Sequence, residues 1–279
     1  MGTEFVTVFW RDMLKFWRFK SMLFASLIQP VLWLALFGIA MSDYFDGLMP
    51  GSGGPEGMLS VDYLTFMLAG VVAMTILFTT LYGGISIQID KMFGLMKEML
   101  ASPMPRTHIL AGITISGVFK SLLQVVIIMV FGLVLGVQVF TDYSATETLM
   151  AVGGILLFVL LFAVGLMFLS SIISMKMESH EGANAVITLV TLPLFFASNA
   201  LYPIATLPTA IKAIAYANPM THFIVGMRYF SIGPEFFSFG TEYVYTTNDL
   251  LMSLMYLVVF NVALFILALR VFQKAKVVG

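Results

Sequence analysis

Uncharged, mostly apolar residues occur in six blocks along this chain, and short segments between the blocks hold most of the charged side chains. Because an α-helix rises about 1.5 Å per residue, about 20 apolar residues cross the hydrocarbon core of a bilayer. The blocks do not alternate in polarity, as the strands of a membrane β-barrel would. The pattern therefore predicts six membrane-spanning helices, over residues 22–42, 63–87, 109–140, 149–175, 183–202 and 250–272.

The composition agrees with a membrane protein. Apolar residues make up 60% of the chain and charged residues 10%, and a water-soluble domain could not hide that much apolar surface. The net charge of −1 gives no indication of nucleic-acid binding, and the absence of cysteine excludes disulfide and thiol chemistry within the chain. We expect one all-α integral membrane domain over residues 1–279. We expect no cleaved signal peptide, because the first apolar block is long for such a signal.

Basic residues favour the cytoplasmic ends of membrane spans and so predict the orientation of the chain. With six spans, most of the 14 lysines and arginines fall on one side: Arg11, Lys15, Arg18, Lys20, Lys91, Lys97, Arg106, Lys176, Arg270, Lys274 and Lys276. We therefore predict a multi-pass protein of the cell membrane (plasma or inner membrane) with both termini in the cytoplasm.

Residues 1–21 are typical of an amphipathic helix that lies in the membrane interface. Polar residues recur at spacings of three and four, which places them on one helical stripe: Glu4, Thr7, Arg11, Lys15 and Arg18. Bulky apolar residues fill the remaining surface. Such a helix would anchor the first span, and whether it also transmits motion stays open.

Two segments on the predicted external side differ from each other. Residues 43–62 are rich in glycine and proline and predict a mobile connection. Residues 203–249 are longer and more apolar, and short helices are predicted over 209–218 and 221–232. This pair indicates a re-entrant helical hairpin that dips into the outer leaflet, and a hairpin lying on the surface is the alternative.

The sequence contains no motif for catalysis or nucleotide binding. His180 and Glu181 lack the second histidine of a zinc motif, and no glycine-rich phosphate-binding loop is present. The spans contain no pair of carboxylates that could relay protons. We expect no enzymatic activity, no metal and no cofactor in this chain, and an energy source outside it.

Lys120 is the one ionisable residue well inside a predicted span, and such a residue is a functional candidate. The third predicted span is about ten residues longer than a crossing needs. The side chain of Lys120 could therefore extend to the headgroups of the inner leaflet. We expect this arrangement or a structural ion pair, with a substrate contact as the alternative.

The cytoplasmic segment 88–108 carries the most specific pattern in the chain. Residues 90–106 predict a short amphipathic helix that is closed by a Ser-Pro-x-Pro sequence. Its apolar residues at near-helical spacing suit the groove of a partner protein: Phe93, Met96, Met99 and Leu100. A helix lying on the membrane surface is the alternative.

This segment resembles the coupling segment of the ABC-2 type permeases, the membrane subunits of ATP-driven exporters. That family has the approximate pattern Gly-Thr-Leu-Glu-x-Leu-Leu-x-Ser-Pro-x-x-Arg. Five residues match it directly: Gly94, Leu100, Ser102, Pro103 and Arg106. Lys97 stands where the family commonly has glutamate, and Glu98 follows it, so the polarity of the contact differs from the family's.

A second resemblance lies in residues 192–203 and the segment after them. Their order is similar to the fifth span and external hairpin of the same family. The residues that carry it are Pro193, Pro203, Pro208, Asn218, Pro219 and Arg228.

The resemblance implies a permease subunit that works as a homodimer with a separate ABC ATPase subunit, which binds the ATP. It implies that the ATPase acts on Gly94, Lys97, Glu98, Leu100, Ser102, Pro103 and Arg106. Multidrug, daunorubicin-resistance and polysaccharide exporters belong to this family, so the expected cargo is an amphiphilic drug, lipid or lipid-linked glycan. The alternatives are an ATP-independent channel or secondary transporter, and a membrane-anchoring assembly subunit.

Overall fold

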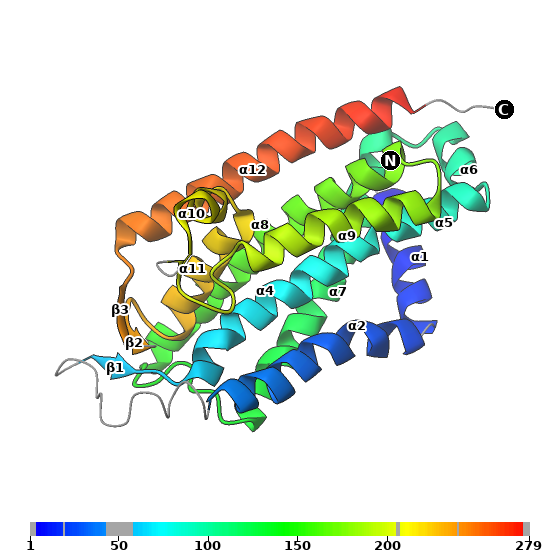
Figure 1. Cartoon of the computed structure of the whole chain (residues 1–279). Coiled ribbons are helices and arrows are strands. Elements are labelled where there is room, and N and C mark those ends of the chain that lie inside the picture. The colour runs from blue at the N-terminus through cyan, green and yellow to red at the C-terminus, as the bar shows by residue number, and fades with distance from the viewer. Residues whose placement is uncertain (1–3, 19, 43–57, 205–206, 239, 276–279) are drawn as a thin grey trace.

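The computed structural model of the chain describes residues 4–18, 20–42, 58–204, 207–238 and 240–275. The glycine-rich part of the predicted external connection, residues 43–57, lies outside these ranges. The described chain is mostly helical, and its long helices run side by side along one axis (Figure 1).

Four helical segments are long and apolar enough to cross a membrane. The first combines α4 (Tyr63–Gly83) with α5 (Ile85–Met92), and the others are α7 (Arg106–Val134), α8 (Ala145–Lys176) and α12 (Thr247–Lys274). Helix α4 is apolar on all sides, as expected for a helix enclosed by others. It packs against α7, α8, α11 and α9 and forms the centre of the bundle.

Side-chain caps fix the starts of α4, α8 and α12. Asp62 accepts a hydrogen bond from the backbone N–H of Thr65 at the start of α4. Helices α8 and α12 begin with capping boxes, in which a hydroxyl residue and an acidic residue three positions later satisfy each other's backbone N–H groups. These local signals agree with the tertiary arrangement.

The first and fifth predicted spans are also helical but shorter. The first consists of α2 (Lys20–Leu32) and the π-helix η1 (Trp33–Gly38), and the fifth is α9 (His180–Phe196). Pro30 lies inside α2 and has no N–H to donate, which weakens the helix just before the π-helical turn. Since four segments meet the length and hydropathy required of a span, the count of six stays a prediction.

Helix α1 (Glu4–Arg18) packs mainly on α7 at the end of the bundle that also holds α6 (Leu95–Ala101) and the last turn of α12 (Figure 1). Met13 and Phe16 are buried against the bundle, whereas Trp10 and Trp17 are exposed. The predicted amphipathic helix is therefore present as a helix, and its aromatic surface is divided between the protein interior and the outside.

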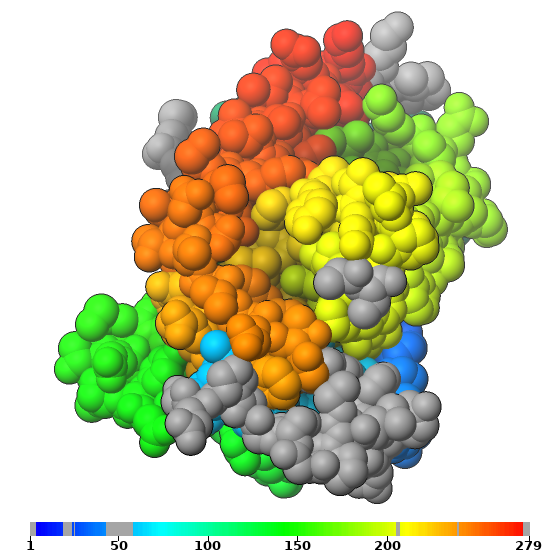
Figure 2. All heavy atoms as spheres, turned by 60° about the vertical axis from the view of Figure 1, so that its left-hand side comes forward, coloured from blue at the N-terminus to red at the C-terminus, as the bar shows by residue number. Residues whose placement is uncertain are grey.

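The opposite end of the bundle holds α10 (Thr209–Tyr216) and α11 (Pro219–Ser231), close to the two short helices that the sequence predicted. Helix α11 packs between α8, α12 and α4, while Ile214 and Tyr216 of α10 are exposed. Figure 2 shows this end, with α10 in yellow beside the orange segment that leads into α12.

A small sheet at this end was not predicted, so the expectation of a purely helical chain was wrong in this respect. Strand β1 (Leu59–Ser60) pairs parallel to β2 (Glu235–Ser238), which pairs antiparallel to β3 (Thr241–Val244). The rings of Phe236 and Tyr243 stack 4.9 Å apart and cover Phe66 of α4. Strands this short leave no detectable alternation in the sequence.

Candidate coupling site and the contacts that hold it

The predicted coupling helix is broken into two pieces. Helix α5 ends at Met92 and α6 begins at Leu95, so the expectation of one helix over residues 90–106 was wrong. Gly94 between them has φ of 77°, in the left-handed region that an α-helix does not contain. The break turns the chain and leaves residues 92–95 at the tip of the segment.

The tip is apolar and exposed. Met92 and Phe93 are each 73% exposed, and Leu95 is also exposed. Lys97 and Glu98 lie exposed beside them on α6. Exposed apolar side chains bordered by charges are typical of a surface that binds another protein.

The other apolar residues of the segment face the bundle. Met96 is 3% exposed, and Met99 and Leu100 are half-buried in the same cluster, which includes Phe272 of α12. The apolar pattern that the sequence revealed therefore has two parts. Met96, Met99 and Leu100 hold α6 on the bundle, and Phe93 projects outward.

The predicted residues after α6 have different environments. The hydroxyl of Ser102 donates a hydrogen bond to the carbonyl of Met99 at 2.8 Å and ends the helix, while Pro103 is exposed. Arg106 donates hydrogen bonds from Nη1 to the carbonyl oxygens of Phe272 and Gln273, at 2.8 and 2.5 Å. A cation stabilises the carbonyl end of a helix, so Arg106 joins α7 to the last turn of α12.

Asp90 joins the coupling segment to α1. Its side chain is 1% exposed, and its two oxygens lie 2.7 Å from Nη2 of Arg11 and 2.8 Å from Nζ of Lys15. Arg11 also lies 2.9 Å from the buried carboxylate of Asp12. Burial by itself would lower the pKa of Arg11, but the charges of Asp12 and Asp90 outweigh it and raise that pKa above its usual value.

Helix α5 is also attached to the end of α8. The side-chain amide of Gln88 donates to the carbonyl oxygens of Ser174 and Met177, at 2.7 and 2.9 Å. Lys91 donates to the same two carbonyls and to that of Met175. The last turn of α8 has carbonyls without helical partners, and these two side chains bind them. A displacement of α5 would therefore move α1 and α8 with it.

The central residues of this arrangement were not predicted from the sequence. Asp12 and Asp90 are the buried acids, and neither was singled out. The spacing of Arg11 and Lys15 by four positions places both cations on one helical face and was the available signal for an acidic partner.

Lys120 lies in α7 and is half-buried. Within the described residues it makes no ion pair and no side-chain hydrogen bond. Its Nζ lies 5.6 Å from the ring centre of Phe16. The expected structural ion pair is therefore not found in the described part of the chain.

The predicted hairpin residues gather at the opposite end of the bundle. Asn218 caps α11 by accepting from the N–H of Met220, and its amide donates to the carbonyls of Leu194 and Ala197 at 2.7 and 2.9 Å. It thereby binds the end of α9, where Pro193 lies inside the helix. Of the other prolines, Pro219 begins α11, Pro208 precedes α10 and Pro203 is buried before it.

Arg228 is the buried centre of this end. It is 0% exposed, and Nη2 donates to the carbonyls of Phe66 and Asn199 at 3.2 and 2.8 Å. Its guanidinium carbon lies 3.5 Å from the ring centre of Phe66, a cation–π contact. Burial raises the pKa of nearby Tyr243, with a smaller opposing effect of Arg228, so the phenol stays neutral. Arg228 therefore fixes α11 to α4 and to the chain after α9.

The sequence model of the ABC-2 type transporter family matches residues 3–231, most of the chain. The chain belongs to the ABC-2 type transporter family. The match includes α1, the coupling segment and the hairpin through Arg228, and it ends before α12.

Relatives of this ABC-2 chain have names from transport. It is 32% identical to the transport permease ycf38 of Porphyra purpurea over 219 residues, which are 78% of this chain and 70% of the relative. It is 28% identical to the ycf38 protein of Cyanophora paradoxa over 74% of this chain and 66% of the relative. It is 25% identical to the daunorubicin resistance ABC transporter permease protein DrrB1 of Streptomyces coeruleorubidus, over 80% and 73% of the two chains.

The family is one of membrane transport permeases, and membership of it implies a partnering ABC ATPase subunit. Among the described residues of this ABC-2 chain, no group of three or more acidic or histidine side chains could hold a metal ion. The main features of the site are an exposed apolar tip and the polar contacts that connect the segment around it to α1, α8 and α12.

Proposed function

We propose that this chain is the permease subunit of an ATP-driven exporter and that the tip between α5 and α6 is where a separate ATPase subunit docks. The observation that carries the proposal is the exposure of Met92 and Phe93 at the break next to Gly94. An ATPase groove that receives Phe93 would remove this apolar surface from water. Lys97 and Glu98 would set the polarity at its border.

The contacts behind the tip make it suitable for transmitting force. Asp90 holds α1 through Arg11 and Lys15, and Gln88 and Lys91 hold the end of α8. A rigid-body movement requires contacts that differ between two states. ATP-driven closure of the ATPase would supply that difference at the tip, and α1, α4 and α8 would move as a result.

The proposal includes the wider architecture expected of an exporter. Two copies of the chain form the pathway, the tip and both termini face the cytoplasm, and the α10–α11 hairpin re-enters the outer leaflet. The proposed cargo is an amphiphilic drug, lipid or lipid-linked glycan. The name of the Streptomyces relative, a daunorubicin resistance permease, favours export of an amphiphile.

The test is reconstitution of the chain with a candidate ABC ATPase subunit from the same organism, followed by measurement of co-purification and ATP hydrolysis. We compare the unchanged chain with Phe93→Ala and Lys97→Glu. One well-buried aromatic contact contributes about 2 kcal/mol or more to an interface. We therefore expect Phe93→Ala to weaken co-purification by about tenfold or more and to abolish stimulation of the ATPase by the permease.

Lys212→Glu is the matched control, because it reverses the same charge on α10 at the other end of the bundle. It should leave co-purification and turnover unchanged. Normal co-purification and normal ATPase stimulation of both tip variants would reject the docking role.

A further inference from the structure

A cavity of about 320 Å³ lies between α1, α2, α4, α5 and α7. Its volume falls at the lower end of the range of small-molecule pockets, about 300–1,000 Å³. The lining residues that bear on its chemistry are Asp12, Lys15, Phe16, Phe78, Ile89 and Lys120. The cavity is distinct from the exposed tip of the coupling segment.

Most of the uncharged polar groups in the cavity wall are already bonded within the protein. The amide of Gln124 donates to the hydroxyl of Ser26 at 2.7 Å, and its oxygen accepts from the hydroxyl of Thr79. The hydroxyl of Tyr82 pairs with that of Thr188 at 3.2 Å. These groups leave little hydrogen-bonding capacity for a neutral polar ligand.

Charge in the cavity is unbalanced. Lys15 is paired with Asp90, and Asp12 is paired with Arg11, so these four groups neutralise one another. Lys120 forms no ion pair within the described residues. The charge of Asp12 attracts its ammonium group, the charges of Arg11 and Lys15 repel it, and the ring of Phe16 lies 5.6 Å from Nζ. Removing an ammonium group from water is costly unless an opposite charge compensates it, and a bound anion would supply that charge.

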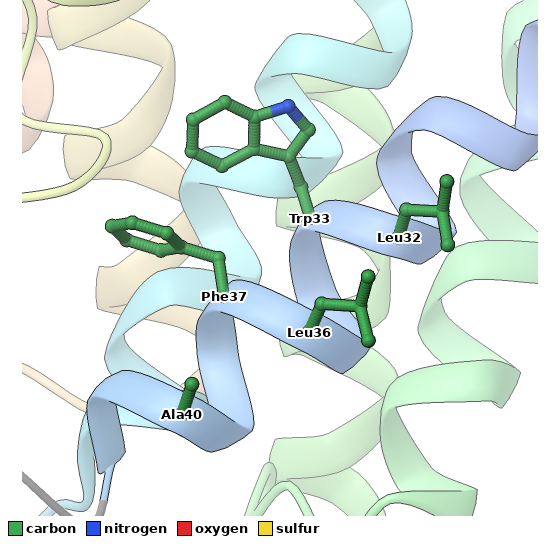
Figure 3. A pocket seen from close by; sticks show the side chains of 5 residues that line it. All are labelled: Leu32, Trp33, Leu36, Phe37 and Ala40. Carbon is green, nitrogen blue, oxygen red and sulfur yellow. The ribbon is translucent and has the colours of Figure 1, made fainter.

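A second pocket, formed by α2 and η1, has no charged lining residue and serves for comparison. Figure 3 shows Leu32, Trp33, Leu36, Phe37 and Ala40 around it, all from α2, η1 and the turn after them. None of the residues that line it is charged, and the indole N–H of Trp33 is their one polar side-chain group. The cavity at Lys120 combines apolar surface with an ammonium group that forms no ion pair within the described residues.

We propose that the cavity binds an amphiphile with one anionic group, such as a carboxylate or phosphate. The anionic group lies on Nζ of Lys120, and the apolar part lies against Phe16, Phe78 and Ile89. The ligand is either an anionic lipid of the surrounding membrane or a free amphiphile, since both present the same chemistry. Binding is a property of this chain by itself and does not depend on the proposed ATPase contact.

The experiment uses the full chain in phosphatidylcholine nanodiscs and a photoreactive diazirine derivative of palmitic acid as the probe. Labelled peptides are mapped by mass spectrometry, and unlabelled palmitate and hexadecanol compete for the site. We expect labelling on α4, α5 and α7, and we expect palmitate to compete about tenfold better than hexadecanol, since a hydrogen bond to a charged group is the stronger kind.

Four variants distinguish the effect of the charge of Lys120 from the effect of the shape of the cavity. Lys120→Gln should weaken competition by palmitate about tenfold and leave hexadecanol unchanged, while Lys120→Arg should retain binding. Ser86→Phe fills the cavity without changing its charge and should abolish specific labelling. Lys212→Gln, which removes a lysine charge on α10, is the matched control and should behave as the unchanged chain.

Equal competition by palmitate and hexadecanol in the unchanged chain would overturn the proposal, and so would labelling that Ser86→Phe does not reduce. These two readouts decide the question even if Lys120→Gln fails to fold. Adding phosphatidylglycerol to the discs distinguishes the sources. Reduced labelling would identify membrane lipid as an occupant, and unchanged labelling would favour a free amphiphile in the same site.

Discussion

Asp90 of α5 accepts a hydrogen bond from Arg11 of α1 at 2.7 Å, across 79 positions of sequence. This contact connects the helix that leads to the exposed tip with the N-terminal helix. Because Asp90 is buried and Arg11 is only partly exposed, the two side chains hold the helices in one relative position.

Asp90→Asn removes the carboxylate that holds Arg11 and Lys15. Leaving a charged group without its buried partner costs about 1–3 kcal/mol, and partial solvent access to both cations keeps the cost at the lower end. We expect a lower unfolding midpoint and reduced stimulation of the ATPase, measured on the purified chain and on the reconstituted complex. Glu242→Gln removes an exposed carboxylate on β3 and is the control. Equal stability of the two variants would mean that Asp90 does not hold α1.

Gly112→Ala tests the packing of α1 on α7 without changing any charge. An added Cβ would lie 2.6 Å from Cβ of Val8 and 2.8 Å from the carbonyl oxygen of Phe5, closer than atoms can approach. Forcing such a group into a packed contact costs about 1–3 kcal/mol. The measurement is the free energy of unfolding of the purified chain.

Gly153→Ala is the matched control for Gly112→Ala, because Gly153 lies in α8 with nothing within 4 Å of the added Cβ. Alanine is about 1 kcal/mol better than glycine in a helix interior, so this variant should be at least as stable as the unchanged chain. A gain of stability in both variants would show that α1 does not pack closely against Gly112.

Arg228→Met removes the guanidinium that binds Phe66 and Asn199. The carbonyl of Asn199 would lose a buried donor, at a cost of about 1–3 kcal/mol. Hydrogen exchange over residues 219–231 should become faster and the unfolding midpoint should fall. Arg228→Lys should recover only part of the loss, because an ammonium group cannot stack on a ring as a planar guanidinium does. Arg270→Met, at an exposed position, is the control, and an equal effect at both arginines would contradict this role.

Single cysteines test the orientation of the chain, which contains no cysteine of its own. Lys97→Cys lies at the proposed cytoplasmic tip, and Glu242→Cys lies on β3 at the other end of the bundle. In intact cells, a membrane-impermeant maleimide should label Glu242→Cys and not Lys97→Cys, and both should react after the membrane is permeabilised. Labelling of Lys97→Cys in intact cells would reverse the proposed topology and exclude an ATPase contact at the tip.

The positions of the long helices could be predicted because the signal lies within each segment. Burial of apolar side chains is favourable wherever they occur, so the length of each block indicates a helix in lipid. The blocks at 63–87, 149–175 and 250–272 correspond to α4–α5, α8 and α12. Capping residues such as Asp62 and Ser144 mark the helix starts in the same local way.

The small sheet and the break at Gly94 could not be predicted with the same rules. Strand β1 contains two residues and pairs with β2 far along the chain, so no local period exists to detect. At residues 90–106 the apolar spacing suited one continuous helix, and the left-handed conformation of Gly94 divided it. After the break, Met96 of α6 packs against the bundle, a contact between residues far apart in sequence.

The sequence by itself determined that the chain is helical and apolar, where most helices lie, and which segment carries the coupling pattern of its family. Only the tertiary structure decided that Arg11 and Lys15 face Asp90 and that Arg106 binds the end of α12. It also decided that Lys120 lines a cavity and forms no ion pair in the described part of the chain. The reason is that transfer of apolar residues into lipid depends on neighbours along the chain. Ion pairs and cavities depend on which side chains meet after residues far apart in sequence have packed together.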